Sequence, residues 1–137
     1  MAEKAVFSLT GYHFNKVSLD LDNIFPNATL DLNFAPSGKF DESTRTFILS
    51  FAFRATSDGK DIVSVNCIAE FEFKDEVTFE NIPEFFYGNS IAILFPYIRA
   101  MVSSITLQAN VQPMILPTLN LVSLKDHLKA NSFVLNG

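Results

Sequence analysis

RTFILSFAFRATSDGKDIVSVNCIAEFEF, residues 45–73, is the stretch that decides the fold. Apolar residues occupy every second position in each half, which is the period of a strand with one buried face. The residues of that face are Phe47, Leu49, Phe51, Phe53 and Ala55, then Val63, Val65, Cys67, Ala69, Phe71 and Phe73. Between the halves, Ser57-Asp58-Gly59-Lys60 is a tight-turn sequence. The stretch therefore predicts a β-hairpin with one core face.

The opposite face of this hairpin is mostly polar, but it includes Ile48, Ala52 and Ile68. Apolar side chains gathered on an otherwise wet surface are typical of interaction sites. We therefore expect this second face to be available for assembly or for capture of a partner.

Two further strands are expected before the hairpin. Residues 6–20 alternate in hydrophobicity, but the phase slips twice, which predicts a long strand with bulges near Gly11 and Asn15. Residues 29–34 alternate again and are followed by Pro36-Ser37-Gly38, a turn sequence. Residues 22–27 between them carry Pro26 and are expected to form a crossover loop.

After Pro83 the hydrophobic period changes to that of a helix. Residues 84–88 predict one short helical turn that ends at Gly88. A longer helix is expected to begin near Phe95, because Pro96 fits only in a first turn. A last helix is expected after Ser123, whose hydroxyl would cap it.

Strands followed by helices predict an α+β fold, with a four-stranded antiparallel sheet covered on one face by a long helix and a short C-terminal helix. The 137 residues suffice for one domain and are too few for two ordinary ones. We therefore treat residues 1–137 as a single domain.

Composition indicates a protein that works by binding. Hydrophobic residues make up 48% of the chain and include 15 Phe, which is more apolar area than one small core holds, so some is expected to meet a partner. The formal charge of -5 disfavours nucleic acid and anionic lipid.

The location expected from the sequence is cytoplasmic, since Met1-Ala2-Glu3-Lys4 does not open a signal peptide and Cys67 has no disulfide partner. Residues 100–124 carry no charge, but Pro113, Pro117 and four amide side chains argue against membrane insertion.

Residues that carry chemistry do not form a recognisable site. Asp20, Asp22 and Asp31 have partial calcium-loop spacing, but Ile24 and Phe25 occupy positions that need a ligand and a glycine. His13, His127 and Cys67 have no neighbours at metal-ligand or catalytic spacing. We expect no metal, no cofactor and no enzymatic activity.

One segment resembles a known family. Ile93-Leu94-Phe95-Pro96-Tyr97-Ile98-Arg99, followed downstream by Leu119-Asn120-Leu121 and a closing helix, is similar to the SecB family of protein-export chaperones. The resemblance implies a homotetramer, built as a dimer of dimers, that binds unfolded client proteins in apolar grooves. It also implies delivery of those clients to the SecA motor.

The resemblance assigns roles to residues of this chain. It places a client groove between the crossover loop and the last helix, lined by Ile24, Phe25, Leu124 and Leu128, with Phe85, Phe86 and Tyr87 as further candidates. Candidates for SecA contact are Asp20, Glu70 and Glu72. The long helix would pack dimer against dimer through Leu94, Tyr97, Ile98, Met101 and Ile105. Phenylalanines in the strands are expected in the core, whereas Phe25, Phe85 and Phe86 are expected to meet clients.

Two alternatives stay open. A SecB-like chaperone can be dedicated to one partner, such as the antitoxin of a toxin–antitoxin pair. Sheet and helix can instead enclose an apolar cavity, in which case the protein would carry a lipid or another apolar small molecule.

Overall fold

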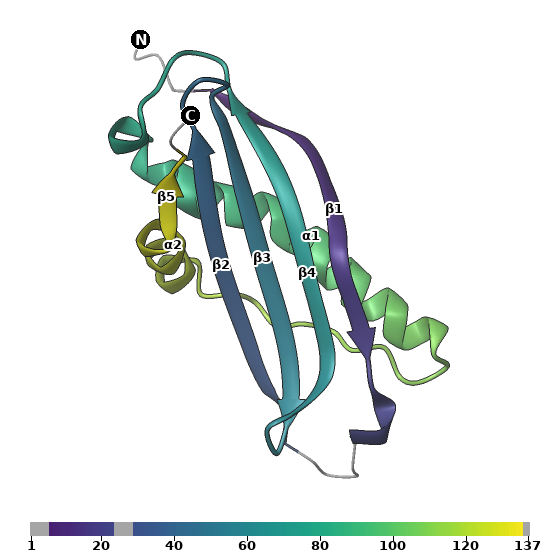
Figure 1. The fold of residues 1–137 in the computed structure, drawn as a ribbon. Helices are drawn as coiled ribbons and strands as arrows, with labels where there is room; N and C mark the ends of the chain where they lie inside the picture. Colours follow the sequence, from purple (N-terminus) through teal and green to yellow (C-terminus); the bar gives the residue numbers. More distant parts are fainter. Residues whose placement is uncertain (1–5, 24–28, 136–137) are drawn as a thin grey trace.

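The computed structural model describes residues 6–23 and 29–135, which form one sheet with both α-helices on the same face (Figure 1). The strands are β1 (Phe7–Leu19), β2 (Asp31–Asp41), β3 (Thr46–Ser57), β4 (Lys60–Phe73) and β5 (Ser132–Val134), in the spatial order β1-β4-β3-β2-β5. The helices are α1 (Glu84–Gln108) and α2 (Leu121–Ala130), with short 3-10 turns at Leu21–Asn23 and Phe79–Asn81. The α+β prediction is confirmed.

The prediction of a four-stranded, wholly antiparallel sheet is wrong in one respect. β5 adds a fifth strand and pairs parallel to β2 over Gly38–Phe40, so the sheet is mixed. Two backbone hydrogen bonds flank this pairing, from Gly38 N–H to the Asn131 carbonyl (3.2 Å) and from Leu135 N–H to the Phe40 carbonyl (2.8 Å). Three residues are too few to produce a readable alternation, so this strand could not be predicted from the hydrophobic pattern.

The hairpin of residues 45–73 is confirmed. Asp58 and Gly59 have φ of 51° and 76°, which is the backbone of the tight turn that matches the twist of paired strands. All eleven predicted core residues of β3 and β4 have at most 1% of their surface exposed. The predicted bulges of β1 are also confirmed, since its register against β4 shifts between Leu9 and Gly11 and again between Phe14 and Lys16.

Helix α1 is held on the sheet by Phe86. Its ring centroid lies 4.8 Å from Phe7, 4.8 Å from Phe47, 5.0 Å from Phe73 and 5.6 Å from Phe71, mostly in edge-on geometry. Such pairs add to the stabilisation that comes from burial alone. Ile91, Leu94, Ile98 and Val102 continue the contact along the helix and are fully buried. Phe86 is therefore a core residue.

Strand β2 differs from the prediction because it continues through Pro36-Ser37-Gly38 to Asp41. The reversal comes later, in residues 42–45, where Arg45 has φ of 58°. Gly38 directs its N–H away from β3 and toward Asn131. The backbone nitrogen of Pro36, two residues earlier, points to the same side. Because the missing N–H of Pro36 would have pointed at the sheet edge, the proline costs the ladder with β3 nothing.

The helix boundaries differ as well. α1 is one continuous helix that includes both Gly88 and Pro96, because the packing of its buried stripe on the sheet outweighs the local cost of these residues. Gly88 lies beneath α2, where an added Cβ would be 3.6 Å from the Lys125 side chain. α2 begins at Leu121 and not after Ser123, since the side chain of Asn120 accepts the Ser123 N–H at 3.2 Å and caps the helix.

Gly38 provides a test of this packing. A Cβ at Gly38 would lie 2.3 Å from the Phe47 ring, so we expect Gly38→Ala to destabilise the fold by about 1–3 kcal/mol through overpacking. Gly11→Ala is the matched control, because its Cβ would meet no atom within 4 Å, and we expect its effect to stay within about 0.5 kcal/mol. Urea unfolding followed by circular dichroism measures both, and equal stability of the two variants would contradict the assigned position of Gly38.

Candidate functional site

An apolar pocket lies between β2 and the C-terminal part of the chain. It encloses about 350 Å³. β2 contributes Leu32 and Phe34, the segment before α2 contributes Pro117, Thr118, Leu119 and Asn120, and α2 contributes Ser123 and Leu124. The pocket is therefore walled by a strand on one side and by a helix with its preceding segment on the other.

The wall formed by Phe34 is rigid because its ring joins the core aromatics. Its centroid is 5.0 Å from Phe53, 6.1 Å from Phe51 and 6.1 Å from Phe95. Phe34 is half-buried and Leu32 is 39% exposed. The pocket therefore offers apolar surface that the fold has already ordered, so a ligand does not have to order it on binding.

The backbone of β2 beside this pocket is open. Alternate residues of a strand direct their N–H and C=O to opposite sides, and Gly38 and Phe40 direct theirs away from β3, toward the C-terminal segment. Leu32 and Phe34 share this parity. β5 covers that edge of β2 only over Gly38–Phe40, so Asp31–Ser37 has no strand partner there within the described part of the chain. Leu32 and Phe34 thus supply both apolar side chains and free backbone groups.

The residues predicted for the client groove are not all brought together. Ile24 and Phe25 lie outside the described residues. Leu124 lines the pocket, whereas Phe85, which is 43% exposed, lies at the start of α1 with its ring 6.4 Å from that of Phe7.

Three other predicted groove residues fill the core. Phe86, Tyr87 and Leu128 are 0%, 2% and 0% exposed, so these side chains present no surface to a client in this conformation. The error for Phe86 and Tyr87 came from treating residues 84–88 as an isolated helical turn. They belong instead to the first turns of α1, which face the sheet.

The pocket residues that the sequence analysis did not single out are Leu32, Phe34, Pro117 and Leu119. The alternation of residues 29–34 and the Leu119-Asn120-Leu121 segment were the available signals. Neither shows which strand edge is left bare, because that depends on where β5 ends.

Two of the three predicted acidic contacts lie on the uncovered face of the sheet. Glu70 and Glu72 are exposed neighbours on β4, where side chains two residues apart point to the same face. Asp20 follows the far end of β1, next to the pairing of Leu19 with Val63. Glu70 is seven positions along β4 from Val63, which corresponds to about 23 Å along the strand. Asp20 is therefore not part of one cluster with the two glutamates.

The residues predicted for helix-to-helix assembly face two ways. Leu94 and Ile98 are fully buried against the sheet, and Met101 and Ile105 are half-buried. Tyr97 is 39% exposed and its ring stacks on Tyr12 at 4.4 Å. The face of α1 that points outward instead carries Ile93, Tyr97, Ala100, Ser104 and Leu107, all exposed. We call these five residues the outer α1 stripe.

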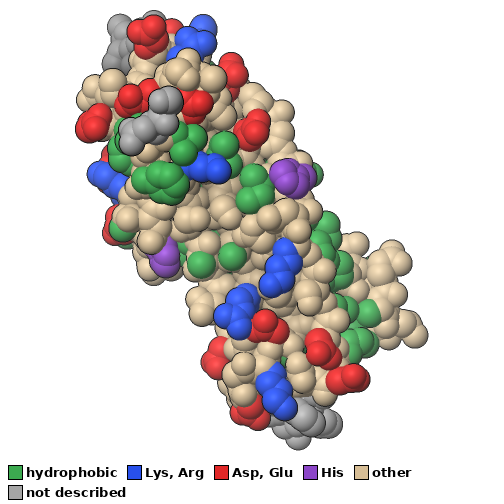
Figure 2. Space-filling model, viewed as in Figure 1, with side chains coloured by type: hydrophobic (Ala, Val, Ile, Leu, Met, Phe, Trp, Pro, Cys, Tyr) green, Lys and Arg blue, Asp and Glu red, His purple; other side chains and the backbone are tan. Residues whose placement is uncertain are grey.

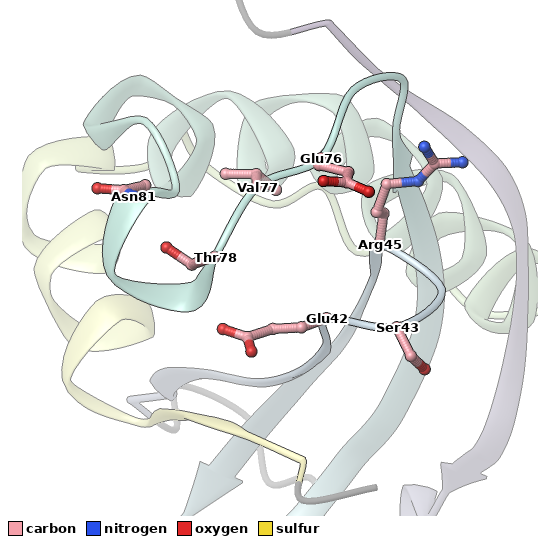
Figure 3. Close-up of a pocket in the computed structure, with 7 residues that line it drawn as sticks. All are labelled: Glu42, Ser43, Arg45, Glu76, Val77, Thr78 and Asn81. Atoms are coloured by element: carbon pink, nitrogen blue, oxygen red, sulfur yellow. The ribbon is translucent and has the colours of Figure 1, made fainter.

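A larger and more polar pocket lies at the end of the molecule near the β2–β3 turn (Figure 3). It encloses about 750 Å³ and is lined by Glu42, Ser43, Arg45, Glu76, Val77, Thr78 and Asn81. The Glu42 carboxylate accepts the Phe79 N–H at 2.7 Å, so Glu42 already serves to fix the loop before α1. This pocket is walled by turns and lacks the apolar floor that a polypeptide groove needs.

Comparison with known proteins identifies the fold. No protein-family model matches the chain. The SecB-like chaperone Rv1957 of Mycobacterium tuberculosis, solved in complex with a ChAD peptide from the Rv1956 HigA1 antitoxin, superposes with a TM-score of 0.60 at 20% identity, covering 83% of this chain and 91% of that one. The fold is SecB-like. This confirms, at the level of the fold, the resemblance seen in the sequence.

Two other proteins match this SecB-like chain. One matches over part of its length, and the other has only low structural similarity. The uncharacterized protein MJ0357 of Methanocaldococcus jannaschii is 39% identical over 67 residues, which are 49% of this chain and 43% of that protein. The matched stretch therefore spans less than half of the archaeal protein. A protein of unknown function from Streptococcus agalactiae aligns with a TM-score of 0.38 at 14% identity.

Helix α1 of this SecB-like fold is long and apolar enough, by length and composition alone, to cross a membrane. The core helix of a globular domain meets the same criterion, and α1 lies on the sheet with Phe86, Ile91 and Leu94 buried beneath it. Its apolar character therefore has a structural reason within the domain.

Reactive side chains do not gather in the described part of the SecB-like chain. Residues 6–23 and 29–135 contain no group of three or more His, Cys, Asp or Glu placed to hold a metal ion. Burial raises the pKa of the Cys67 thiol to about 11, so at neutral pH this side chain is a protonated, apolar part of the core.

Proposed function

We propose that this chain is a chaperone that holds extended polypeptide segments in the pocket between β2 and α2. The observation that carries the proposal is the double role of Leu32 and Phe34. Their side chains line the pocket, and their backbone groups face the edge of β2 that β5 leaves bare. The superposition on a SecB-like chaperone solved with an antitoxin peptide supports the same proposal.

Such a site favours affinity without sequence specificity. Hydrogen bonds from an added strand use the client's backbone, which is the same for every sequence. Apolar contact contributes about 25 cal/mol per Å² whichever aliphatic or aromatic side chains supply it. A client segment therefore needs to be extended and to have apolar residues at alternate positions. Folded proteins rarely expose such segments, so the site would select unfolded chains.

A chaperone dedicated to one partner is the second candidate. It is favoured by the antitoxin peptide bound to the mycobacterial chaperone. The two candidates differ in breadth, because a general holdase suppresses aggregation of many clients and a dedicated one protects a single cognate protein. A carrier of lipid or another apolar small molecule is less well supported, since such a ligand would leave the backbone groups of Leu32 and Phe34 without partners.

Delivery of clients to SecA in the cytoplasm is the remaining part of the proposal. Glu70 and Glu72 are exposed side by side on a sheet face that no described element covers, which suits a basic surface on the motor. Binding of the purified protein to SecA, measured with and without Glu72→Lys, tests this step. Equal binding by both proteins would remove Glu72 from the interface.

We further propose that the outer α1 stripe packs dimer against dimer in a homotetramer. Its members recur at spacings of four, three, four and three residues, which is the repeat of helices that pack along a seam. β1 supports assembly independently, because it is a 13-residue strand at the edge of the sheet. The unpaired backbone groups of a long bare edge can pair with a strand of another chain.

Ala100 and Ala92 provide a matched test of the stripe. Both are exposed on α1, but only Ala100 belongs to the stripe. We expect Ala100→Glu to convert a species of four 15.3 kDa chains into a smaller one, because it buries a charge in the seam. Ala92→Glu should leave the mass unchanged. Light scattering measures both, and a wild-type monomer would contradict the proposed tetramer.

Leu32 provides a test of the groove. Leu32 is 39% exposed, so Leu32→Ser should have little effect on folding while it removes apolar contact with a client. We expect the affinity for a fluorescently labelled, extended apolar peptide to fall by about tenfold, equivalent to about 1.4 kcal/mol. Val122→Ser is the control, because Val122 is 68% exposed on α2 but does not line the pocket.

Aggregation of a refolding client, measured with the same variants, distinguishes the candidates. A general holdase suppresses aggregation, and Leu32→Ser weakens that effect. If Leu32→Ser and Val122→Ser behave like wild type in both measurements, the pocket is not the client site.

A further inference from the structure

The face of the sheet opposite the helices is the second large surface of the molecule, and Figure 2 looks directly onto it. Hydrophobic side chains there surround a basic group, with acidic groups toward the same end of the molecule. A pocket of about 350 Å³ on this face is lined by Ser37, Gly38, Lys39, Ile48, Ser50, Ile68 and Phe133. Phe133 is 57% exposed. This surface is separate from the groove between β2 and α2.

One row of side chains crosses all five strands of this face. The register pairs Phe133 with Lys39, Lys39 with Ile48, Ile48 with Glu70, and Glu70 with Gly11. From β5 to β1, the row therefore holds an aromatic, a basic, an apolar and an acidic side chain, and it ends at a glycine, which has none. Strands lie about 4.8 Å apart, so Lys39 and Glu70 are each one strand away from Ile48 on either side.

The row is complementary to itself. β3 is the middle strand of the order β1-β4-β3-β2-β5. A two-fold axis parallel to β3, between two copies placed face to face, would exchange β2 with β4 and β5 with β1. Lys39 of one copy would then face Glu70 of the other, and Ile48 would face Ile48. Each charged pair would occur twice, as a closed two-fold interface requires.

Phe133 and Gly11 complete the match at the ends of the row. The same axis places the exposed Phe133 ring opposite Gly11, where an added Cβ would meet no atom within 4 Å. The position is open, so it has room for an aromatic ring. Phe133 would be buried by the contact, and aromatic residues are enriched in protein interfaces.

The neighbouring rows are compatible with close approach. The next row toward the hairpin turn pairs Ser37 with Ser50, Ser50 with Ile68, and Ile68 with His13. Its members are small or apolar except for His13, which is exposed on β1. On the other side, Asp41 would approach Glu72 of the second copy. The Asp41 carboxylate is turned toward its own Ser43, whose hydroxyl and N–H donate to it at 2.6 Å and 3.0 Å.

We propose that this face docks a second copy of the same chain, through the row Phe133–Lys39–Ile48–Glu70–Gly11. The proposal does not rest on the chaperone function, and it uses neither the groove nor the outer α1 stripe. It has a functional consequence, because it buries Glu70. The self-associated form is closed to any partner, SecA included, that needs this acidic surface.

Charge exchange tests the proposal. Lys39→Glu would place two carboxylates opposite each other, and Glu70→Lys would place two ammonium groups together. We expect each to raise the dissociation constant of the face-to-face dimer by about tenfold or more. The double variant Lys39→Glu/Glu70→Lys restores the opposite charges and should return the constant to within about threefold of wild type. Sedimentation over a range of protein concentrations measures all four proteins.

Two controls separate this contact from other association. Lys60→Glu, at the exposed end of the hairpin, changes the net charge as Lys39→Glu does and should leave sedimentation unchanged. Ile48→Cys lies on the proposed axis, so a short bis-maleimide should cross-link this variant as a dimer. Ser18→Cys, which is exposed on β1 two strands away from β3 and the axis, should not cross-link.

The proposal is overturned if the single reversals sediment like wild type, if the double variant stays as dissociated as the singles, or if Ile48→Cys fails to cross-link. Circular dichroism of each variant shows that it is folded. Because these outcomes concern only the open sheet face, they are independent of client binding and of the Ala100→Glu test.

Discussion

The packing of α1 on one face of the sheet is the constraint on which the rest of the structure depends. The alternation in β3 and β4 creates a continuous apolar surface, and this surface has to be covered. Phe86 inserts among Phe7, Phe47, Phe71 and Phe73 and fixes the start of α1 there. α2 is fixed in turn, because Leu128 is buried and Lys129 donates to Glu84 at 2.7 Å. That contact lowers the pKa of the Glu84 carboxyl.

This packing uses most of the phenylalanines and decides which apolar surface is left. Phe34 lies where the helix-covered core ends at β2, with its ring in contact with the core and part of its surface exposed. Because α2 is held at its C-terminal end and β5 follows directly, the chain returns to β2 only at Gly38. The bare edge at Leu32 and Phe34 is therefore a consequence of where α2 ends. The groove exists because the short β5 covers only part of a long strand.

Much of the fold was predictable because the signals for it are local. Alternation in residues 45–73 predicted the hairpin and its core face, and the two phase slips predicted the β1 bulges. The errors occurred where tertiary contact outweighs local propensity. Pro36 looked like a turn but lies at an edge where no N–H is needed, and Pro96 looked like a helix start but lies inside α1.

The site was less predictable than the fold for a related reason. Period-two alternation does not distinguish a phenylalanine under a helix from one at a strand edge, so Phe34 passed unnoticed. Phe86 was assigned to a client because its contacts come from strands distant in the sequence. The row across the open face depends on the register of all five strands, including β5, which the sequence did not predict.

The central claim is that β2 offers its backbone, as well as its apolar side chains, to an extended client. Two peptides of one alternating apolar and polar sequence test it, one N-methylated at the apolar residues and the other at the polar residues. In a strand added antiparallel to β2, residues that bond to Leu32 and Phe34 direct their side chains toward the pocket. Methylation at the apolar residues should therefore lower the affinity by about tenfold or more, through loss of two or more backbone hydrogen bonds. Methylation at the polar residues should leave it nearly unchanged, and equal affinities of the two peptides would contradict the claim.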